Sequence, residues 1–420
     1  MSKLTKFIKS PNLFIKDMFL KKLGIKPVVK PVVKPVVKPV VKPVVKPVVK
    51  PVVFKHNFNL NIFNDILFLH TGEKDNALAH IKIWYPYFVE SGVSFIIITR
   101  FIEAYDSIIN EYPESNVVFA KDKKDIDSLF FAFPAIKACF YPSNTGNNSH
   151  LLYQTNIKHI FIGHGDSDKS ASAHKFFRVY DENWVAGEAH VDRILNARFN
   201  LNGLKHIKVG RPTLTDILKK TTLHWKDRFE GKYNLLYLPT WEGTYKEQDY
   251  SSLSIIKKNI GSLESIENLN LAIKLHPFSG RRQKIFLTLE ESLTYEESPI
   301  TKSNLSIIPK SETLSKYIVN SNLFICDISA VVSECLSANA PIFLYIPKDK
   351  DINIASSNMP YEEYCYLFSS SEELYELIKE VLNDNDYLAE KRLKAQEYII
   401  NVKDTLDNTF IKQLKLLGEE

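Results

Sequence analysis

The sequence has few cysteines and no long apolar run, and both shortages narrow the class of protein. Its four cysteines, Cys139, Cys326, Cys335 and Cys365, form no CxxC pair, and at least three lie in apolar surroundings. This pattern is typical of reduced core thiols. No segment approaches the roughly 20 apolar residues of a membrane-spanning helix, and no signal-peptide core with a cleavage site is present. We therefore expect a cytoplasmic protein that is neither integral to a membrane nor secreted by that route.

The sequence also has little net charge and lacks two common ligand motifs. The formal net charge is +5 over 420 residues, and part of it comes from one lysine repeat. Nucleic acid is therefore not an expected partner. Neither a GxGxxG motif nor a cluster with metal-ligand spacing appears. We expect no cofactor and no metal site, so that side chains and helix N-termini must neutralise any bound phosphate.

What is present is ample material for globular cores. Hydrophobic residues make up 45% and aromatic residues 12% of the chain, which does not favour disorder outside compositionally biased segments. A chain of 420 residues is long for one domain, so two domains are the working expectation.

Two unusual segments precede the globular part. Residues 1–26 place seven lysines among large apolar side chains, and a helix is predicted from about Asn12. Such a basic amphipathic segment can lie on anionic lipid, or it can pack on the protein's own surface. The unit Lys-Pro-Val-Val then repeats over residues 27–53 with a proline every four residues, which excludes a helix and favours an extended tether. The alternative for this repeat is a ligand for a peptide-binding domain.

Alternating strands and helices are predicted after Phe54. Apolar strands are expected at 66–69, 93–99, 117–119, 135–141 and 159–162, then at 235–238, 271–275, 305–309, 323–326 and 342–345. Strands separated by helices favour parallel sheets. We therefore expect an α/β protein with two Rossmann-like domains that face a cleft, at residues 54–231 and 232–385, followed by C-terminal helices over 386–420.

The predicted strand at 159–162 ends in a segment dense in chemistry. It continues as Gly163, His164, Gly165, Asp166, Ser167, Asp168 and Lys169. The glycines permit close backbone approach, and a histidine titrates near neutral pH. The acid, hydroxyl and lysine groups can meet a phosphate or an acceptor hydroxyl. The alternative for His164 is a structural role, such as capping the next helix.

Polar residues also follow three predicted strands of the second half. These residues are Thr240, His276, Asp327, Ser329 and Glu334. The carboxyl ends of parallel strands are where ligands bind, and helix N-termini there favour anions. Glu334 is placed to accept a hydrogen bond from a sugar hydroxyl. The alternative for Asp327 or Ser329 is that the side chain only caps a helix. The alternative for Trp241, which follows Thr240, is that its ring only packs in the core.

These motifs resemble the CDP-glycerol glycerophosphotransferases, which build teichoic acids and some bacterial capsules. Asp327-Ile-Ser-Ala-Val331 is similar to the family's Asp-Tyr-Ser-Ser-Val but lacks its second serine, and Pro239-Thr-Trp241, His276-Pro277 and His164-Gly165 also match. The usual Thr-Pro-Leu-Lys after His-Gly is replaced here by Asp-Ser-Asp-Lys. Gly210-Arg211-Pro212 resembles a further family motif, in which Arg211 can contact a phosphate. The resemblance spans about residues 58–381 and implies the two-domain fold called GT-B.

The resemblance implies a reaction and its partners. A polyol-phosphate unit would pass from a CDP-activated donor to a lipid-linked, growing cell-surface polymer, on the inner face of the cell membrane. His164 would be the base, and His276 with Ser329 would stabilise charge on the pyrophosphate. Thr240, Asp327 and Glu334 would bind the donor, and Gly165, Asp166, Ser167, Lys169 and Arg211 would bind the acceptor or a phosphate. The alternatives are a GT-B glycosyltransferase, such as a sialyl- or other sugar transferase in capsule or lipooligosaccharide synthesis, and a non-catalytic assembly protein.

Overall fold

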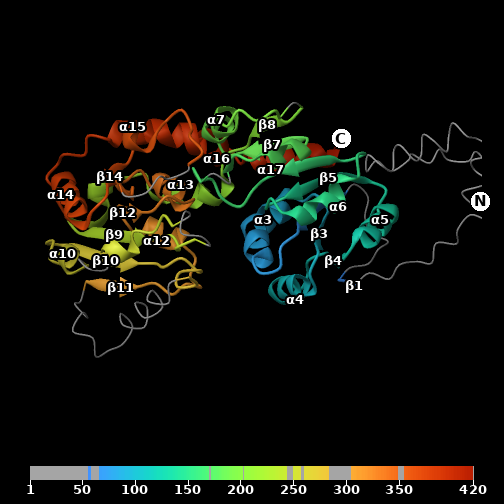
Figure 1. The fold of residues 1–420 in the computed structure, drawn as a ribbon, viewed down its shortest axis with the longest axis horizontal. Helices are drawn as coiled ribbons and strands as arrows, with labels where there is room; N and C mark the ends of the chain where they lie inside the picture. The colour runs from blue at the N-terminus through green and yellow to red at the C-terminus, as the bar shows by residue number, and fades with distance from the viewer. Residues whose placement is uncertain are drawn as a thin grey trace, which may run out of the picture. The chain divides into compact units, whose positions relative to one another are not determined.

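Two sheets organise the part of the chain that the structure describes, which in this computed structural model is residues 55–57, 66–169, 172–201, 203–243, 249–256, 260–282, 304–348 and 354–419. Helices cover both sheets (Figure 1). The predicted α/β class is therefore confirmed. The basic segment 1–26 and the tether 27–53 lie outside the described residues, and the domain boundaries at 231 and 385 stay predictions.

The first sheet has the strand order β1-β4-β3-β2-β5-β6-β7-β8. Its strands are β1 (Lys55–His56), β2 (Ile66–Thr71), β3 (Phe95–Thr99), β4 (Val117–Phe119), β5 (Ile136–Tyr141), β6 (Lys158–Phe161), β7 (Glu182–Val185) and β8 (Lys205–Lys208). Neighbours are parallel except β1 with β4. Because the chain runs outward from β2 to β4 and then from β5 to β8 on the other side, the strand order reverses between β2 and β5. Continuous apolar runs suit these central strands, which are buried on both faces.

The second sheet is parallel throughout and has the order β11-β10-β9-β12-β13-β14. Its strands are β9 (Tyr233–Leu238), β10 (Leu269–Ile273), β11 (Leu305–Ile307), β12 (Leu323–Cys326), β13 (Ile342–Tyr345) and β14 (Tyr366–Phe368). Here the order reverses between β9 and β12. Thr240 and Ser329 follow these two strands, so both lie near the place where open α/β sheets bind ligands.

The helices of the described residues connect and cover the strands. They are α3 (Ala77–Ser91), α4 (Ile102–Glu111), α5 (Lys123–Ala132), α6 (Ser149–Leu152), α7 (Glu188–Asn196), α8 (Thr215–Lys220), α9 (Leu253–Ile256), α10 (Ile260–Glu264), α12 (Ser315–Val319), α13 (Val331–Leu336), α14 (Ser371–Leu382), α15 (Ala389–Ala395), α16 (Val402–Leu406) and α17 (Thr409–Glu419).

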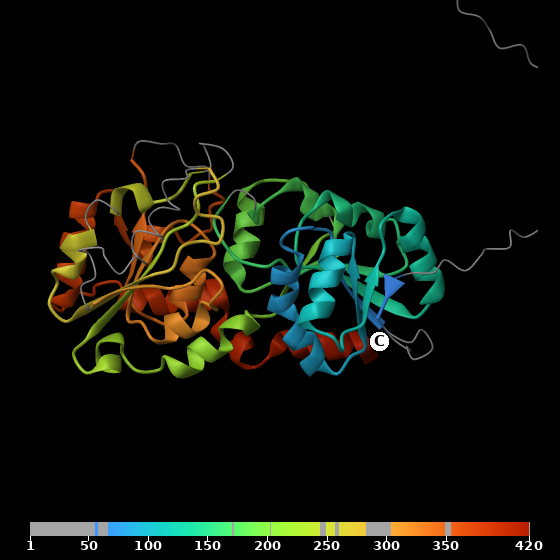
Figure 2. The ribbon, with the colours of Figure 1, turned by 90° about the horizontal axis from the view of Figure 1, so that it is seen from below.

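The C-terminal helices return to the first sheet (Figures 1 and 2). Phe410 of α17 packs against Trp84 of α3, with ring centroids 4.7 Å apart. Gly210 after β8 has a φ of +71° and contacts Thr405 of α16 so closely that a Cβ there would lie 2.4 Å from the Thr405 nitrogen. The C-terminal helices expected over 386–420 are present, and a π-helical turn (Gln396–Ile400) interrupts them before Asn401. Strand β14 was not among the strands predicted from the sequence.

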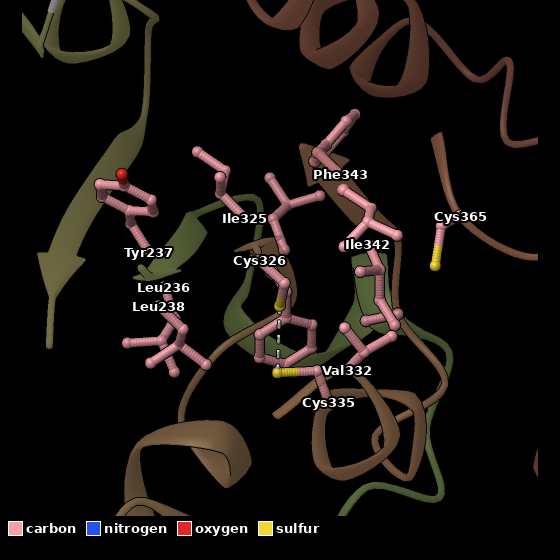
Figure 3. Packing of buried hydrophobic residues seen from close by; sticks show 14 of the residues in the cluster. Leu236, Tyr237, Leu238, Ile325, Cys326, Val332, Cys335, Ile342, Phe343 and Cys365 are labelled. Atoms are coloured by element: carbon pink, nitrogen blue, oxygen red, sulfur yellow. Dashed lines mark hydrogen bonds between the residues drawn. The ribbon is translucent and has the colours of Figure 1, made fainter. Parts of the chain in front are cut away.

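The core of the second half explains the cysteines. Figure 3 shows Cys326 of β12 and Cys335 of α13 facing each other, with Cys365 farther off. The two facing sulfur atoms are 3.8 Å apart, and all four cysteines of the chain are free and buried. Burial also raises the pKa of the Cys335 and Cys365 thiols well above the usual value. The expectation of core thiols is confirmed.

Candidate active site

His164 stands at the carboxyl end of β6 in a defined tautomer. The chain turns at Gly163, which has a φ of +63°, and a β-branched or bulky residue would be strained there. His164 Nδ1 lies 3.0 Å from the carbonyl oxygen of Pro142. Because a carbonyl only accepts, Nδ1 carries the proton, and Nε2 keeps a free lone pair when the ring is neutral. A general base on a hydroxyl needs this arrangement.

The surroundings of His164 keep its ring neutral. Its side chain is exposed at one edge, yet the surrounding protein removes enough water to lower the pKa of His164, and Arg211 adds to this effect. The ring stacks on His80 at a centroid distance of 4.0 Å. Burial and the neighbouring His164 lower the pKa of His80 to about 3. Two neutral imidazoles therefore lie face to face.

A buried ion-pair cluster shapes the loop after His164. The guanidinium of Arg193 on α7 binds both Asp166 and Asp168. Burial alone would raise the pKa of Asp166, but Arg193, His190 and Arg211 together outweigh burial and lower it. His190 lies beside this cluster, and burial lowers its pKa to about 4. The Asp166 carboxylate is thus committed to Arg193, so it is better placed to hold the loop than to contact an acceptor.

The same loop contacts the second half of the molecule directly. A Cβ on Gly165 would lie 3.0 Å from the Cβ of Ala330, and Ser333 Oγ donates to the Asp166 carbonyl at 3.2 Å. The Ala355 N–H donates to the Asp168 carbonyl at 2.7 Å. Glycine at 165 therefore allows the two halves to approach closely. Ser167 does not share in this, because its hydroxyl lies 3.3 Å from that of Ser172 in its own loop.

Lys169 ends the loop on the donor side. Its Nζ donates to Thr240 Oγ1 at 3.3 Å and lies 5.6 Å from the centre of the Tyr250 ring. Burial lowers the pKa of Lys169, and Asp327 partly opposes this. From the sequence, Lys169 was assigned to the acceptor or a phosphate, and the structure places its Nζ against Thr240 of the second half. Nothing in the sequence predicts that crossing.

His276 follows β10 and has the opposite tautomer to His164. Its Nδ1 accepts the Phe278 N–H at 3.1 Å, so Nε2 carries the proton of the neutral ring. Burial, with Lys169 as the next contribution, lowers the pKa of His276 to about 4. Trp241 lies nearly parallel to the ring at 6.3 Å. A neutral N–H donor is therefore held at the carboxyl end of the sheet.

Asp327 organises the loops around this edge. Its Oδ2 accepts the N–H groups of Thr240 at 2.8 Å and Ser252 at 3.1 Å. The side chain is fully buried, and burial raises the pKa of Asp327 to about 7. Ser329 Oγ donates to the Asp327 carbonyl at 3.2 Å, while Ser329 itself is only partly buried. Asp327 therefore positions Thr240, and Ser329 is the more accessible of the two motif residues.

Glu334 and Arg211 connect the two edges electrostatically. Burial raises the pKa of Glu334, and Arg211 partly offsets this. Burial lowers the pKa of Arg211, which Asp166 and Glu334 oppose. The Arg211 N–H donates to Thr405 Oγ1 at 2.8 Å, so α16 fixes the backbone of this residue. The structure thus brings together His164 with Arg211 and Lys169 with His276, and the contacts of Gly165 and Ser333 join the two groups.

Comparison with known proteins agrees with this geometry. The family model of CDP-glycerol:poly(glycerophosphate) glycerophosphotransferase matches residues 153–408, which include both histidines and the whole second sheet. The chain belongs to this family. It is therefore a transferase, and the resemblance seen in the motifs is confirmed. The match begins after β5. It therefore leaves out β2, β3, β4 and β5, which the sequence resemblance included.

Solved structures share the fold of this family member. The wall teichoic acid polymerase TagF is 16% identical, with a TM-score of 0.55 and coverage of 84% of this chain and 89% of that one. A glycosyltransferase from Rickettsia africae is 12% identical, with a TM-score of 0.52 and coverage of 85% and 98%. UDP-GlcNAc 2-epimerase from Methanocaldococcus jannaschii is 13% identical, with a TM-score of 0.51 and coverage of 83% and 99%. No curated protein matches the chain.

Proposed function

We propose that this glycerophosphotransferase family member moves a polyol-phosphate unit, such as glycerol phosphate, from a CDP-activated donor to a growing cell-surface polymer, a teichoic acid or a capsule. The acceptor hydroxyl oxygen attacks the donor phosphorus that carries the polyol, and the pyrophosphate bond breaks to release CMP. The hydroxyl proton passes to His164 Nε2. The net change is one phosphodiester formed, one pyrophosphate bond broken and one proton transferred.

The observation that carries this proposal is the pair of histidines in opposite tautomers at adjoining sheet edges. His164 Nε2 can accept a proton, whereas His276 Nε2 can donate a hydrogen bond to a phosphate oxygen. Lys169 lies against Thr240 on the donor side and supplies positive charge for the leaving phosphate. Ser329 and the N-terminus of α13 add donors at the point where the strand order of the second sheet reverses.

Proteins of similar fold indicate the alternative function that the experiment must exclude. The neighbours include a glycosyltransferase and an epimerase complexed with UDP-GlcNAc, so a GT-B glycosyltransferase is the second candidate. The full chain should be incubated with a short poly(glycerophosphate) acceptor and a panel of CDP-polyols and UDP-sugars. Mass spectrometry should find the acceptor lengthened by a polyol-phosphate unit only with a CDP-polyol. Extension by a sugar from a UDP donor would replace the proposal with the glycosyltransferase.

We further propose that the enzyme works at the inner face of the membrane through its N-terminal segment. Within the described residues, no helix is both long and apolar enough to span a bilayer. Seven lysines among apolar residues in 1–26, and the charged repeat over 27–53, support reversible binding to anionic lipid. A lipid-linked acceptor would then stay within reach of the catalytic part.

A further inference from the structure

A group of buried polar side chains at the edge of the first sheet has no part in the transfer steps above. His70 and Thr71 end β2, Arg100 follows β3, and Ser143 and Asn148 follow β5. None is more than 5% exposed. In the described part of the chain, the Thr71 hydroxyl and Arg100 Nε lack a hydrogen-bond partner, and the His70 ring has only the Asn148 side chain beside it as a hydrogen-bonding group. Burying a donor without a hydrogen-bond partner costs free energy, so this group is a candidate ligand-binding site.

Arg100 supplies a positive charge whose present contacts are all neutral. Its Nη1 donates to the Asn147 carbonyl at 3.3 Å, and its Nη2 donates to the Lys121 carbonyl at 2.7 Å and to His150 Nδ1 at 2.6 Å. Burial lowers the pKa of Arg100, and the charges of Asp122 and Asp125 partly oppose this. A buried charge is normally paired. A guanidinium with one N–H free here favours an anion.

The remaining members of the group can complete an anion site. His150 accepts from Arg100 through Nδ1, so the neutral ring carries its proton on Nε2. Burial lowers the pKa of His70 to about 3, which leaves a neutral ring with one N–H to donate. The Thr71 hydroxyl can donate as well, and Ser143 can donate from its place beside the Glu73 carboxyl. Asn147 and His150 are only partly buried and form the solvent side of the group.

The position of the group in the fold is that of a ligand site. β3, β2 and β5 are consecutive in the sheet, and the strand order reverses between β2 and β5, where open α/β sheets bind ligands at their carboxyl ends. The group also borders the proposed base. The Pro142 carbonyl holds His164 Nδ1 at 3.0 Å, and Ser143 is the next residue.

We propose that Arg100, His150, Thr71, Ser143 and His70 form a phosphate-binding site that holds a phosphate group of the acceptor polymer beside His164. In a poly(polyol phosphate), the terminal hydroxyl and the preceding phosphate lie on the same repeating unit. A phosphate site next to the base would therefore select a polymer end over a free polyol. The identity of the acceptor rests on the proposed function, whereas the affinity for phosphate does not.

The test measures binding of inorganic phosphate and glycerol 3-phosphate to the full chain by calorimetry. CDP is kept saturating, so that the donor half is occupied and cannot bind the probe. We expect binding that Arg100→Gln weakens at least about tenfold, as loss of a charged hydrogen bond implies, and that Arg100→Lys weakens less. Arg178 is an exposed arginine of the same half, so Arg178→Gln is the matched control and should bind as the parent does.

Thr71→Val keeps the test valid if Arg100→Gln fails to fold. The Thr71 hydroxyl has no partner in the described protein, so this variant should melt at the parent's temperature or above it and still bind phosphate several-fold more weakly. Absence of phosphate binding by the parent, or equal affinities in Arg100→Gln and Arg178→Gln, would overturn the site. Arg100-dependent binding without any polyol-phosphate transfer would instead overturn the proposed function and leave the site standing.

Discussion

His164 and His276 hold their ring protons on opposite nitrogens. The Pro142 carbonyl fixes the proton of His164 on Nδ1 at 3.0 Å, whereas the Phe278 N–H fixes the lone pair of His276 on Nδ1 at 3.1 Å. Burial lowers both pKa values, that of His276 to about 4. Two neutral imidazoles therefore offer an acceptor on one side and a donor on the other, which is the division of roles that phosphoryl transfer to a hydroxyl needs.

Replacing His164 should slow the chemical step and spare donor binding. We expect His164→Ala to lower kcat by about 10² to 10⁴-fold, because the acceptor hydroxyl loses its base. Calorimetry should find CDP binding little changed. His174 is exposed, and its Nδ1 accepts the Phe176 N–H of its own turn, so His174→Ala is the control and should retain full kcat. A fully active His164→Ala enzyme would refute the assignment.

Replacing His276 or Ser329 should weaken the donor complex. Each of His276→Ala and Ser329→Ala removes a donor to a charged phosphate, at a cost of roughly 1 to 3 kcal/mol in binding. His276→Gln keeps an N–H near the place of Nε2, so it should recover part of the affinity for the CDP donor. If calorimetry gives parental affinity in both alanine variants, the donor site lies elsewhere.

Much of the fold and part of the site follow from local sequence signals. Apolar runs that end in a polar residue marked the strands before His164, Thr240, His276 and Asp327, because strand ends are short-range features. The parallel arrangement then requires these ends to share a sheet edge. The tautomer of His164 could not be predicted, since it depends on the Pro142 carbonyl, which lies 22 residues away in the sequence.

Contacts between residues far apart in the chain could not be predicted from the sequence. Arg193 lies on α7, yet it binds Asp166 and Asp168, and no local pattern links a helical arginine to a distant loop. Arg100 is a single charged residue after β3. An arginine on the surface would have the same local sequence pattern, so its burial could not be predicted. The direction taken by Lys169 depends on how the loop contacts the second half, which is a property of the assembled fold.

Lys169 should serve the donor although it belongs to a loop of the first half. Because its Nζ lies 3.3 Å from Thr240 Oγ1, we expect Lys169→Met to weaken binding of the CDP donor about tenfold or more, as loss of a charged partner implies. Lys175→Met is the control, since Lys175 is exposed. Donor affinity that stays parental while the acceptor KM rises would restore the acceptor role expected from the sequence.

The N-terminal 53 residues should attach the enzyme to lipid without being needed for chemistry. Deleting residues 1–53 removes the seven lysines of 1–26 and the charged repeat. Each lysine near the lipid surface contributes on the order of 1 kcal/mol to binding. Sedimentation should find the truncated chain released from anionic liposomes, with turnover of a soluble acceptor largely intact. Binding of the full chain should also weaken with salt. Equal sedimentation of both forms would place the membrane contact elsewhere.

Buried histidines make the stability of the fold depend on pH. Burial lowers the pKa values of His70 and His80 to about 3, and those of His190 and His276 to about 4, from 6.5. Between these values and 6.5 the unfolded chain binds more protons than the folded chain, so stability is fully present above pH 6.5 and falls as the solution is acidified. Asp327 has the opposite sign, because burial raises its pKa to about 7.

Acidification from pH 7.5 to 5.0 should therefore lower the urea midpoint of unfolding. Each histidine contributes up to about 1.4 kcal/mol per pH unit below 6.5, and Asp327 offsets about one of them, because over this range it takes up a proton only in the folded state. Asp327→Asn removes that offset, so its midpoint should fall more steeply with acid than that of the parent. A midpoint that is unchanged or higher at pH 5.0 in the parent would mean that these histidines accept protons within the fold, and it would remove the argument that His276 is a neutral donor.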